Sequence, residues 1–476
     1  MKYKKAVFID LWESFYDRHP IYAISAMLKK NNIQTEYMFS KDPEKILKQL
    51  KNQDFDMFLY SAFSSHIPQF IDFDKKLKQM HPQGFSIIGG PGVNDKESHL
   101  SLSQSTINAT CVGEGDIVME DFIKTSGNCT FNLIEAKNLS SQHVYHKYAE
   151  LDNLPFPDRD VVYRTDKLRA LMPSKQFMAG RGCPYKCTYC HNHLEHELFK
   201  GSGRSVRLKS VDYLIEEIKQ VQKNYPLKTI VFQDDIFYLN KKWGQEFCER
   251  FPREVGIPFT CNVRSNLIDE DVVRSLSEGG CETVAWAIES GDPEIRNKIL
   301  KRNVTDEGIL NAAELFNKYK IKHRINNVIG IPGESFEQML KTLDLNIRAK
   351  PYLSSAHIFI PFQGLQLTDY AISSGYLNPT KTQTLPNTYA DNTVLNFSEE
   401  DKVRIKKLML LFPILTRFPY LYNNKFLFRI AFKMPIMILN VIYEPIHLFF
   451  WSRMYRVSTG VGTKLRIMRR YFSYGA

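Results

Sequence analysis

The sequence predicts an α/β protein in which two successive parallel-sheet regions precede a mainly helical C-terminal region. Short apolar runs alternate with helical patterns up to about residue 125, and a β/α rhythm of about 30 residues begins near residue 176. The last 76 residues are rich in aromatic and basic side chains. Because the chain has 476 residues, 43% of them hydrophobic, it can form two or three packed domains and is not disordered.

The first 125 residues carry strand candidates that alternate with helical segments, one of which is Ile21–Leu28. The strand candidates are Ala6–Leu11, Met57–Tyr60 and Phe85–Ile88. Ligands of parallel sheets bind at the carboxyl ends of the strands. Three loops there are rich in small residues: Ser61–Ser65, Gly89–Gly92 and Gly113–Asp116. Together they favour a Rossmann-like ligand-binding domain. No G-x-G-x-x-G opens the first helix, so a dinucleotide is not expected.

Residues 126–172 are expected to form a connector that Pro155 and Pro157 punctuate. Residues 173–380 are expected to form a partial (β/α)6 barrel, and residues 381–476 a helical region. The barrel strands expected are Gln176–Ala179, Thr229–Phe232, Phe259–Val263, Thr283–Ile288, Arg324–Ile329 and His357–Ile360. The helical patterns between them are Val211–Gln222, Asp269–Ser277, Asp306–Tyr319 and Ser335–Ala349. Six units are fewer than a closed barrel needs, so this one should be open.

Three cysteines follow the first barrel strand with the spacing C-x3-C-x2-C: Cys183, Cys187 and Cys190. Cysteine runs of this kind hold iron–sulfur clusters. A closed zinc site or an ordinary four-iron cluster needs a fourth ligand, and the next cysteine is Cys248. One iron would therefore stay open to a substrate or cofactor. The alternatives are a chance grouping or a zinc site completed by a neighbouring histidine: His191, His193 or His196.

Polar residues also follow the other expected barrel strands: Gln233–Asp235, Arg264, Glu289–Ser290 and Gly330–Glu334. A single acidic residue at such a position is usually a helix cap or a surface group. The carboxyl ends of barrel strands meet at one mouth, where barrel enzymes carry their chemistry. Five converging loops therefore favour a functional site.

Over residues 5–380 the sequence resembles the radical S-adenosylmethionine (SAM) enzymes, and within them the branch with an N-terminal cobalamin-binding domain. The three-cysteine motif carries the superfamily resemblance; the other matching pieces are Leu154–Pro157, Ala287–Gly291, Ile329–Glu334 and Gly113–Gly115. The resemblance implies a [4Fe–4S] cluster on the three cysteines and an open iron that SAM chelates. Reductive cleavage of SAM would then release a 5′-deoxyadenosyl radical, with flavodoxin or ferredoxin as the electron donor.

The resemblance also implies which residues contact SAM. Tyr189 would stack near the adenine, and Asp234 and Asp235 would hold the amino group. Arg264 would bind the carboxylate, because its planar guanidinium matches that anion.

Farther along the barrel, Glu289 and Ser290 match the strand that contacts the ribose, and the backbone at Ile329 matches the one that contacts the adenine. His191–His193 are expected to be loop residues near the active site. The sequence assigns no general base.

In the N-terminal region, Ser61–Phe63 resembles the S-x-L loop and Gly89–Gly90 the double glycine that cradle the cobalamin nucleotide tail, while Gly113–Glu114 points to the same branch. No D-x-H-x-x-G follows the first strand, although His19 lies close. The lower face of cobalt is therefore expected to be open or water-bound, and loss of cobalamin is the alternative. Residues 361–367 depart from the P-x-P-G-T of relatives, so this loop is expected to select the substrate.

The function predicted is a cobalamin-dependent radical SAM methyltransferase acting on unactivated carbon of an apolar or natural-product substrate. The alternatives are a radical SAM cyclase or rearrangement enzyme, with or without cobalamin, and an iron–sulfur or cobalamin carrier. A tRNA methylthiotransferase is disfavoured, because relatives of that kind carry three further cluster-binding cysteines. Only Cys111 and Cys129 precede Cys183 here. The later cysteines, Cys248, Cys261 and Cys281, are expected to be small buried hydrophobes.

The charge of +11 is concentrated at the C-terminal end, where residues 401–476 hold 14 Lys and Arg against two acidic residues. Met434–Trp451 is nearly all apolar, but prolines and a carboxylate make it a poor membrane span. The region is expected either to cap the barrel or to lie on an anionic membrane surface or contact a lipid-like substrate. Nucleic acid is disfavoured, because no RNA-binding module is recognisable.

The N-terminal apolar run Ala6–Ile9 is too short for a signal peptide. The expected location is therefore cytoplasmic, with peripheral contact to a membrane.

Overall fold

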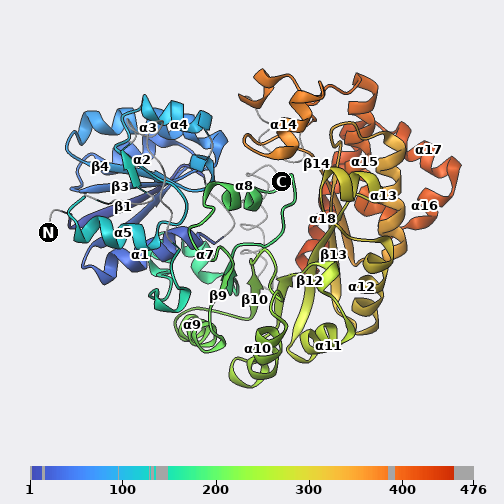
Figure 1. The fold of residues 1–476 in the computed structure, drawn as a ribbon, viewed down its shortest axis with the longest axis horizontal. Helices are drawn as coiled ribbons and strands as arrows, with labels where there is room; N and C mark the ends of the chain where they lie inside the picture. Colours follow the sequence, from blue (N-terminus) through green and yellow to red (C-terminus); the bar gives the residue numbers. More distant parts are fainter. Residues whose placement is uncertain are drawn as a thin grey trace. The chain divides into compact units, whose positions relative to one another are not determined.

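The computed structural model describes residues 3–12, 17–94, 96–127, 129, 133–135, 148–383 and 392–454. The chain forms two compact units. The first contains the residues up to Leu171 together with His191–Lys209, and the second contains Met172–Cys190 and the chain from Ser210 to Lys464. Each unit is built around a six-stranded sheet (Figure 1). The predicted fold class is confirmed: a Rossmann-like sheet, a barrel-like parallel sheet and a helical C-terminal region.

The sheet of the first unit has the strand order β2-β1-β3-β4-β5-β6. Its strands are β1 Lys5–Asp10, β2 Gln34–Phe39, β3 Met57–Ser61, β4 Phe85–Gly89, β5 Ala109–Cys111 and β6 Leu133–Glu135. All neighbouring pairs are parallel except β5 and β6, which are antiparallel. The edge strand β2 begins with three polar residues, Gln34–Glu36, and its apolar part, Tyr37–Phe39, is only three residues long, so the sequence pattern did not reveal it.

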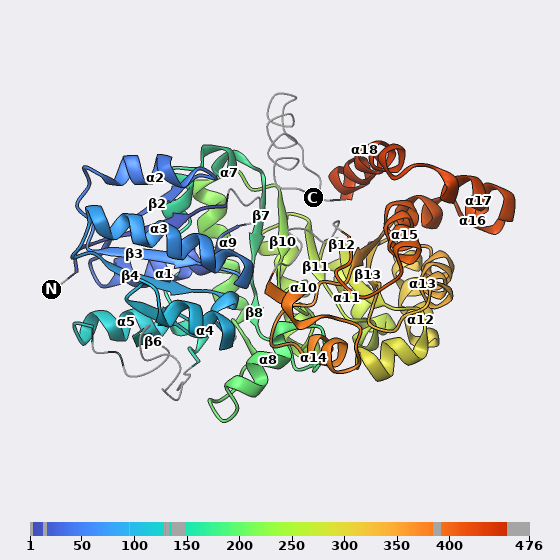
Figure 2. The same ribbon diagram turned by 90° about the horizontal axis from the view of Figure 1, so that it is seen from above.

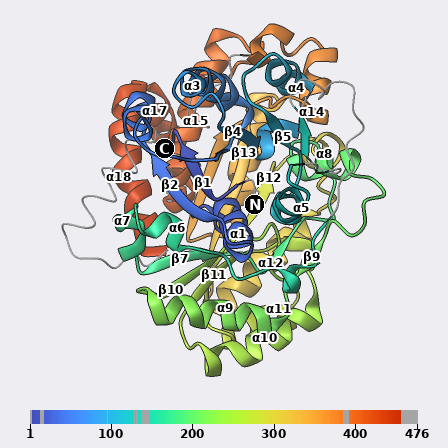
Figure 3. The same cartoon turned by 90° about the vertical axis from the view of Figure 1, so that its left-hand side faces the viewer.

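Helices cover both faces of this sheet (Figures 1 and 3). α1 (His19–Lys30) and α5 (Asp116–Lys124) lie side by side on one face. The other face carries α2 Pro43–Leu50, α3 Ile67–Met80 and α4 Lys96–Ser103. The helices α6 Asp160–Tyr163, α7 Lys167–Leu171 and α8 His191–Leu198 and the short strand β9 Arg207–Leu208 complete the unit. Central strands buried on both faces read as continuous apolar runs, which is why β1, β3 and β4 were predicted correctly.

The sheet of the second unit has the order β14-β13-β12-β11-β10-β7, and all its neighbouring pairs are parallel. Its strands are β7 Ser174–Phe177, β10 Thr229–Phe232, β11 Phe259–Asn262, β12 Cys281–Glu289, β13 Lys322–Ile329 and β14 Leu353–Ile358. The short strand β8 is Gly180–Arg181. The spatial order follows the chain order, as the predicted six-unit open barrel requires.

Five helices line the outside of this sheet in chain order (Figure 2). They are α9 Val211–Asn224, α10 Lys241–Glu254, α11 Glu270–Glu278, α12 Asp306–Lys318 and α13 Phe336–Ala349. Each begins at a side chain that accepts a hydrogen bond from the backbone of its first turn: Ser210, Asn240, Asp269, Thr305 and Ser335. Such caps accept hydrogen bonds from N–H groups that have no partner within the helix. The positions of the helix starts can therefore be predicted from the sequence.

The predicted bounds of the last strand were wrong: β14 begins at Leu353, four residues before the expected start at His357. The first part of the strand carries Ser354 and Ser355, which gave no apolar signal. Ser354 is nevertheless buried, because its hydroxyl donates to Oδ1 of Asn346 on α13 at 2.7 Å. A satisfied buried hydroxyl replaces the apolar residue that the pattern would have shown.

The C-terminal region is helical, as predicted. Its helices are α15 Glu399–Arg417, α16 Pro419–Asn423, α17 Lys425–Lys433 and α18 Ile436–Met454, and the helix α14 Gln366–Ser373 precedes it. α15 packs against β14, α13 and α18. Among the described helices, none is by itself long and apolar enough to cross a membrane. α17 and the first part of α18 reach that length and composition only as a pair, with a bend of 106° between them.

Candidate active site

The cysteine loop, residues 182–190, follows β8 and is fixed by contacts with other loops of the second unit. The backbone N–H of Thr188 donates to the carbonyl of Leu300 at 3.3 Å, and its hydroxyl donates to the carbonyl of Ile299 at 2.7 Å. The carbonyl of Thr188 accepts from the N–H of Leu367, at the start of α14, at 3.0 Å. Segments after β12 and β14 therefore hold the centre of the loop.

Arg264, at the carboxyl end of β11, holds the loop from another side. Its Nη1 lies 3.7 Å from Sγ of Cys187, and its Nε donates to Asn266 at 2.8 Å. Its Nη2 donates to the carbonyl of Arg302, and the guanidinium stacks on the ring of Tyr185 at 3.8 Å. A cation beside a sulfur stabilises thiolate charge. Arg264 is thus placed to hold the cysteine loop as well as the predicted carboxylate.

The three cysteines differ in exposure: Cys187 is buried, whereas Cys183 and Cys190 are partly exposed. Within the described ranges, no three His, Cys, Asp or Glu side chains converge on a single metal ion. The cysteines of a four-iron cluster bind different irons, so their sulfurs need not meet at one point. Three thiols on one braced loop, one of them beside a guanidinium, fit a cluster with an open iron.

The two aspartates after β10 have different environments. Both carboxylate oxygens of Asp234 accept backbone N–H groups, from Ala179 at 2.9 Å and from Gly180. Asp234 is buried. Its two hydrogen bonds fix the backbone at Ala179 and Gly180, just before the cysteine loop. Asp235 is exposed, and its negative charge is one of the causes that raise the pKa of Cys183, after burial of that thiol. Of the two, Asp235 is the one that an amino group can reach.

Tyr189 belongs to a buried polar network at the end of β12. Its hydroxyl donates to Oε1 of Glu289 at 2.9 Å and accepts from Nη1 of Arg302 at 3.1 Å. Arg302 also lies 3.7 Å from Oε1 of Glu289 and donates to the carbonyl of Ala287 at 2.6 Å. Burial raises the pKa of Glu289, and the charge of Arg302 opposes this shift. The network holds the Tyr189 ring and a carboxyl group together.

Glu289 has a backbone φ of 69°, in the left-handed region, and the register with β13 shifts beside it. Such strain persists only where the surrounding structure enforces it, and it clusters at functional sites. The expected ribose residue Ser290 is fully buried, and its hydroxyl oxygen accepts from the N–H of Asp292 at 3.2 Å. The carbonyl of Ile329 accepts from the N–H of Phe359 at 3.0 Å, which ties the ends of β13 and β14 together.

The carboxyl edge of the first unit's sheet is built from small residues. Ser61 and Gly89, the last residues of β3 and β4, are paired in register, and Ser61 and Phe63 are exposed. A Cβ on Gly90 would lie 2.7 Å from the carbonyl oxygen of Ala62, and Gly90 has a φ of 101°. Glycine is therefore required for the two loops to close against each other. Together they form an open edge with little side-chain bulk.

The neighbouring loop after β5 is anchored. Gly113 has a φ of 81°, and Glu114 forms an ion pair with Arg207, whose guanidinium stacks on Tyr148 at 4.6 Å. At the end of β1, Asp10 accepts from the hydroxyl of Tyr37 at 2.7 Å. These contacts fix both flanks of the open edge.

Above β1, Trp12 occupies the third position of the missing D-x-H-x-x-G. Its ring stacks on His66 at 3.7 Å. An aromatic pair thus lies just after β1, at the position that the missing D-x-H-x-x-G would occupy.

Residues 178–345 match the model of the radical SAM superfamily. The match contains all three cysteines and the ends of β10, β11 and β12, which contact their loop. Residues 178–345 therefore form a radical SAM domain. Such a domain implies a [4Fe–4S] cluster and SAM as cofactors, and the cysteine loop and the Tyr189–Glu289–Arg302 network lie within the matched region.

Three known proteins are similar to this radical SAM enzyme over most of their length. An uncharacterised methyltransferase of Pyrococcus horikoshii is 27% identical over 341 residues, which are 70% of this chain and 72% of the relative. The cobalamin-dependent SAM radical enzyme OxsB, solved with aqua-cobalamin and SAM, matches with a TM-score of 0.69 and 14% identity over 99% of this chain and 76% of its own. The methyltransferase TsrM of Kitasatospora setae, solved with cobalamin and a [4Fe–4S] cluster, gives 0.62 and 12% over 79% and 80%.

Sequence analysis missed Arg302, which organises the network around Tyr189 and Glu289. Arg302 stands in the segment Lys301–Asn303, which matches no motif and follows no predicted strand. Its partners come from β12 and the cysteine loop, so only the fold brings them together.

A polar set on β13, β14 and α18 was also missed. Asn327 bonds to Asn346 of α13 on the outer face of the sheet, so Arg324 and Asn326 face the opposite, inner side. Five buried atoms in this set have no hydrogen-bond partner in the part of the chain that the structure describes: Arg324 Nε, Asn326 Oδ1, Ser355 Oγ, Glu444 Oε2 and His447 Nδ1. Buried polar atoms are normally paired, so these are available to water or to a ligand.

Burial and the charge of Arg324 together lower the pKa of His357 to about 4 and that of His447 to about 3. Both imidazoles are therefore neutral at pH 7, and Arg324 is the cation of the polar set. A ring stack of Tyr443 on His447, at 5.3 Å, holds the latter in place.

Glu334, the last residue of the Gly330–Glu334 motif, is expected to make stability depend on pH. Its carboxyl accepts from the N–H of Ile331 at 3.1 Å, and burial raises its pKa from 4.5 to about 8. Folding therefore favours the protonated acid. This contribution is complete below pH 4.5 and is lost as the pH rises to about 8, at up to about 1.4 kcal/mol per pH unit.

The variant Glu334→Gln mimics the protonated acid, so its stability should fall less between pH 5 and 8 than that of the wild type. Denaturant midpoints across this pH range measure the difference. Glu337→Gln, an exposed neighbour on α13, is the control and should keep the wild-type slope. Parallel pH profiles for the wild type and Glu334→Gln would show that Glu334 is ionised when folded.

Proposed function

We propose that this radical SAM enzyme is a cobalamin-dependent methyltransferase that acts on unactivated carbon of a small molecule. The observation that carries the proposal is the pairing, in one chain, of a braced three-cysteine loop with a Rossmann-like sheet whose carboxyl edge is open and small. The methyltransferase names of the Pyrococcus relative and of TsrM support it. Cobalamin in OxsB and TsrM, which share the fold, supports a corrinoid on this edge.

In this proposal Cys183, Cys187 and Cys190 hold the cluster, and Asp235 reaches the amino group of SAM. Arg264 braces Cys187 and offers positive charge toward the SAM carboxylate. A cluster held by these three cysteines would supply the electron that cleaves SAM, and a redox protein such as flavodoxin or ferredoxin would replace that electron. Asp234 acts through the loop backbone that it fixes.

The adenosine end of SAM would lie against Tyr189 and the strand ends at Glu289, Ser290 and Ile329. The strained Glu289 and its partner Arg302 keep the aromatic ring oriented. Because the side chain of Ser290 is fully buried, its backbone, and not its hydroxyl, would contact the ribose.

For cobalamin, the proposed cradle is Ser61, Phe63, Gly89, Gly90, Gly113 and Glu114. The open edge of β3 and β4 fits a large planar ligand, because no side chain longer than that of Phe63 projects from its two loop tips. Bound there, cobalamin would carry the methyl group. The aromatic pair of Trp12 and His66 flanks this edge.

The substrate proposed is a largely apolar small molecule with a polar group. The unpaired atoms of Arg324, Asn326 and Ser355 on the inner face of the barrel sheet, together with that of His447 on α18, would bind the polar group.

The domains proposed are a cobalamin domain at residues 1–125 and a radical SAM barrel at residues 173–380. The location proposed is cytoplasmic, with contact to a membrane surface.

The test uses the full chain, reconstituted anaerobically with iron, sulfide and hydroxocobalamin. We expect a corrinoid spectrum that survives desalting, and with dithionite and SAM both 5′-deoxyadenosine and S-adenosylhomocysteine. Methyl-deuterated SAM should pass its label to a small molecule from a cell extract. Ser61→Trp places a bulky ring on the open edge and should lose corrinoid while it still cleaves SAM.

Two results would contradict parts of the proposal. Formation of 5′-deoxyadenosine without S-adenosylhomocysteine would favour the cyclase or rearrangement enzyme. A protein that takes up no corrinoid would show that the N-terminal sheet has lost this ligand.

A further inference from the structure

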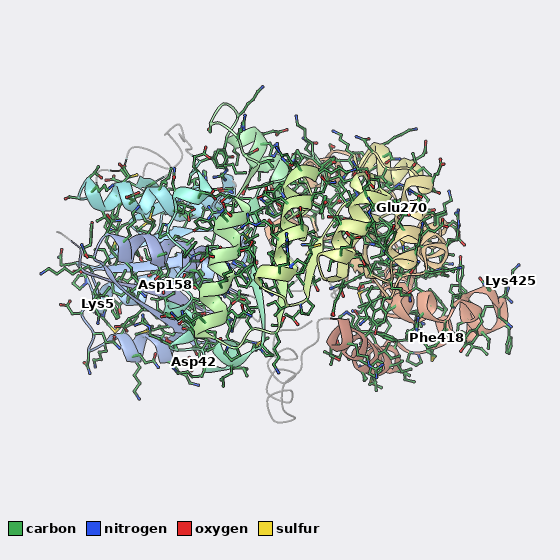
Figure 4. All side chains as sticks on the ribbon, turned by 90° about the horizontal axis from the view of Figure 1, so that it is seen from below. Lys5, Asp42, Asp158, Glu270, Phe418 and Lys425 are labelled. Carbon is green, nitrogen blue, oxygen red and sulfur yellow. The ribbon has the colours of Figure 1, made fainter. Side chains whose placement is uncertain are left out.

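The last three helices expose large apolar side chains in an unusual concentration. Of the 15 exposed large hydrophobic residues in the described chain, eight lie between positions 418 and 449. They are Phe418, Tyr420, Phe426, Ile430, Met437, Ile438, Val441 and Phe449. Scattered exposed apolar residues need no explanation, but a concentration of this kind marks an interaction surface. Figure 4 labels Phe418, which directly precedes α16, and Lys425, the first residue of α17.

α17 is held to the second unit by one face only. On that inner face Phe432 contacts Phe336 of α13 at 5.6 Å between ring centroids, and Phe428 contacts Tyr422 at 5.3 Å. Its backbone is tied as well, since Lys407 of α15 donates to the carbonyl of Phe432 at 2.6 Å. The helix is therefore docked on the protein, and its other face is turned outward.

The outer face of α17 carries two adjacent stripes at helical spacing. Lys425, Arg429 and Lys433 are exposed at intervals of four residues, and Phe426 and Ile430 are exposed beside them. Phe426 keeps 70% of its surface in solvent. Residues four apart lie above one another on a helix, so the cations form one row and the apolar residues the next.

α18 repeats this division. Leu439 and His447 are buried and belong to its inner face, which packs on α15. On its outer face Met437 and Val441 keep 75% and 71% of their surface exposed, and Phe449 continues the same stripe. The outer faces of α17 and α18 together are the apolar and basic surface named here the C-terminal face.

The charge of the C-terminal face selects its partner. No ion pair joins Lys425, Arg429 or Lys433 to a carboxylate anywhere in the described ranges, and Glu444 is the only acidic residue in 417–454. A second copy of the chain would bring the same cations against this row. The following residues 455–476 carry five further Lys and Arg and no acid, so they too would repel it. The partner must therefore be anionic and also accept apolar side chains.

We propose that the C-terminal face docks on the surface of an anionic lipid bilayer. Basic side chains would lie among the headgroups while Phe426, Met437 and Val441 enter the boundary with the acyl chains. The 106° bend between α17 and α18, and a row of cations on α17, argue for lying on the bilayer instead of crossing it. This docking does not depend on the methyl-transfer proposal, since it uses no residue of the radical SAM site.

The test is flotation of the full-length protein with vesicles. We expect binding to vesicles of phosphatidylcholine with phosphatidylglycerol at low salt, weaker binding at high salt, and little binding to pure phosphatidylcholine. The triple variant Lys425→Gln, Arg429→Gln, Lys433→Gln should bind about 100-fold more weakly, because each cation near an anionic surface contributes about fivefold. Phe426→Ser with Met437→Ser should also weaken binding.

The matched charge control is Lys45→Gln, Lys48→Gln, Lys51→Gln, three exposed lysines of the first unit. The apolar control is Leu100→Ser, at an exposed position of α4. Both controls should bind like the wild type, and all variants should retain SAM cleavage.

Absence of binding to anionic vesicles, or equal loss in the Lys45/Lys48/Lys51 control, would overturn the proposal. So would a dimer, detected by light scattering, that Phe426→Ser with Met437→Ser converts to a monomer without any vesicle binding by the wild type. A wild-type protein that floats with anionic vesicles but transfers no methyl group would contradict the proposed function. It would not contradict the proposed docking surface.

Discussion

Replacing Cys183, Cys187 and Cys190 together by alanine is expected to abolish both iron–sulfur assembly and SAM cleavage. The physical reason is that the thiolates are the cluster's only protein ligands in this superfamily, and without the cluster no electron reaches the sulfonium. We expect loss of bound iron and sulfide, loss of the cluster absorbance, and a fall in 5′-deoxyadenosine to the level without enzyme. Anaerobic reconstitution followed by iron analysis and chromatography measures all three.

The matched control is Cys248→Ala, which removes a thiol buried against the helices of the barrel core. It should retain iron and SAM cleavage, although loss of a small buried group costs some stability. A triple variant that still bound iron and cleaved SAM would rule out the cysteine loop as the cluster site.

Replacing Arg302 by methionine is expected to destabilise the second unit by about 3 to 5 kcal/mol, because it leaves Glu289 buried without its cation. Only 8% of the surface of each residue is exposed, so solvent cannot replace the lost partner. The same variant should cut SAM cleavage, since the hydroxyl of Tyr189 loses one of its two partners. Urea denaturation followed by fluorescence, with 5′-deoxyadenosine assays, measures both effects.

The control Arg274→Met removes an ion pair with Asp271 on the surface of α11, and it should cost at most about 1 kcal/mol. The double variant Arg302→Met with Glu289→Gln removes the uncompensated charge and should recover part of the stability. If Arg302→Met lowered the free energy of unfolding no more than Arg274→Met, the Tyr189–Glu289–Arg302 network would not contribute to stability.

Much of the second unit could be read from the sequence, because its strands and caps carry local signals. Thr229–Phe232 is apolar and buried on both faces, and Asp269 caps α11 as its position before an apolar pattern predicts. The buried thiols of Cys248, Cys261 and Cys281 were also expected, and all three are buried. Polar strands were harder. β2 and the first half of β14 escaped detection because their first residues are polar; Ser354 of β14, for example, is buried through its hydrogen bond to Asn346.

The site shows the same division. The cysteine spacing and the strand-end positions of Asp234, Arg264 and Glu289 could be recognised in the sequence. The roles of these residues could not be recognised there. Asp234 is occupied by the backbone of Ala179 and Gly180, and Arg264 is shared among a sulfur, a carbonyl and an aromatic ring.

By itself the sequence determined the fold class, the cysteine motif, the family and the basic character of the C-terminal region, since each depends on residue type and spacing along the chain. Only the tertiary structure decided which aspartate is accessible, that Arg302 pairs with Glu289, and which stripes of α17 and α18 face outward. These features depend on contacts between segments that lie up to about a hundred residues apart in the sequence, such as the contact between Tyr189 and Glu289. Local patterns cannot fix such contacts, because burial and pairing depend on what the rest of the chain places there.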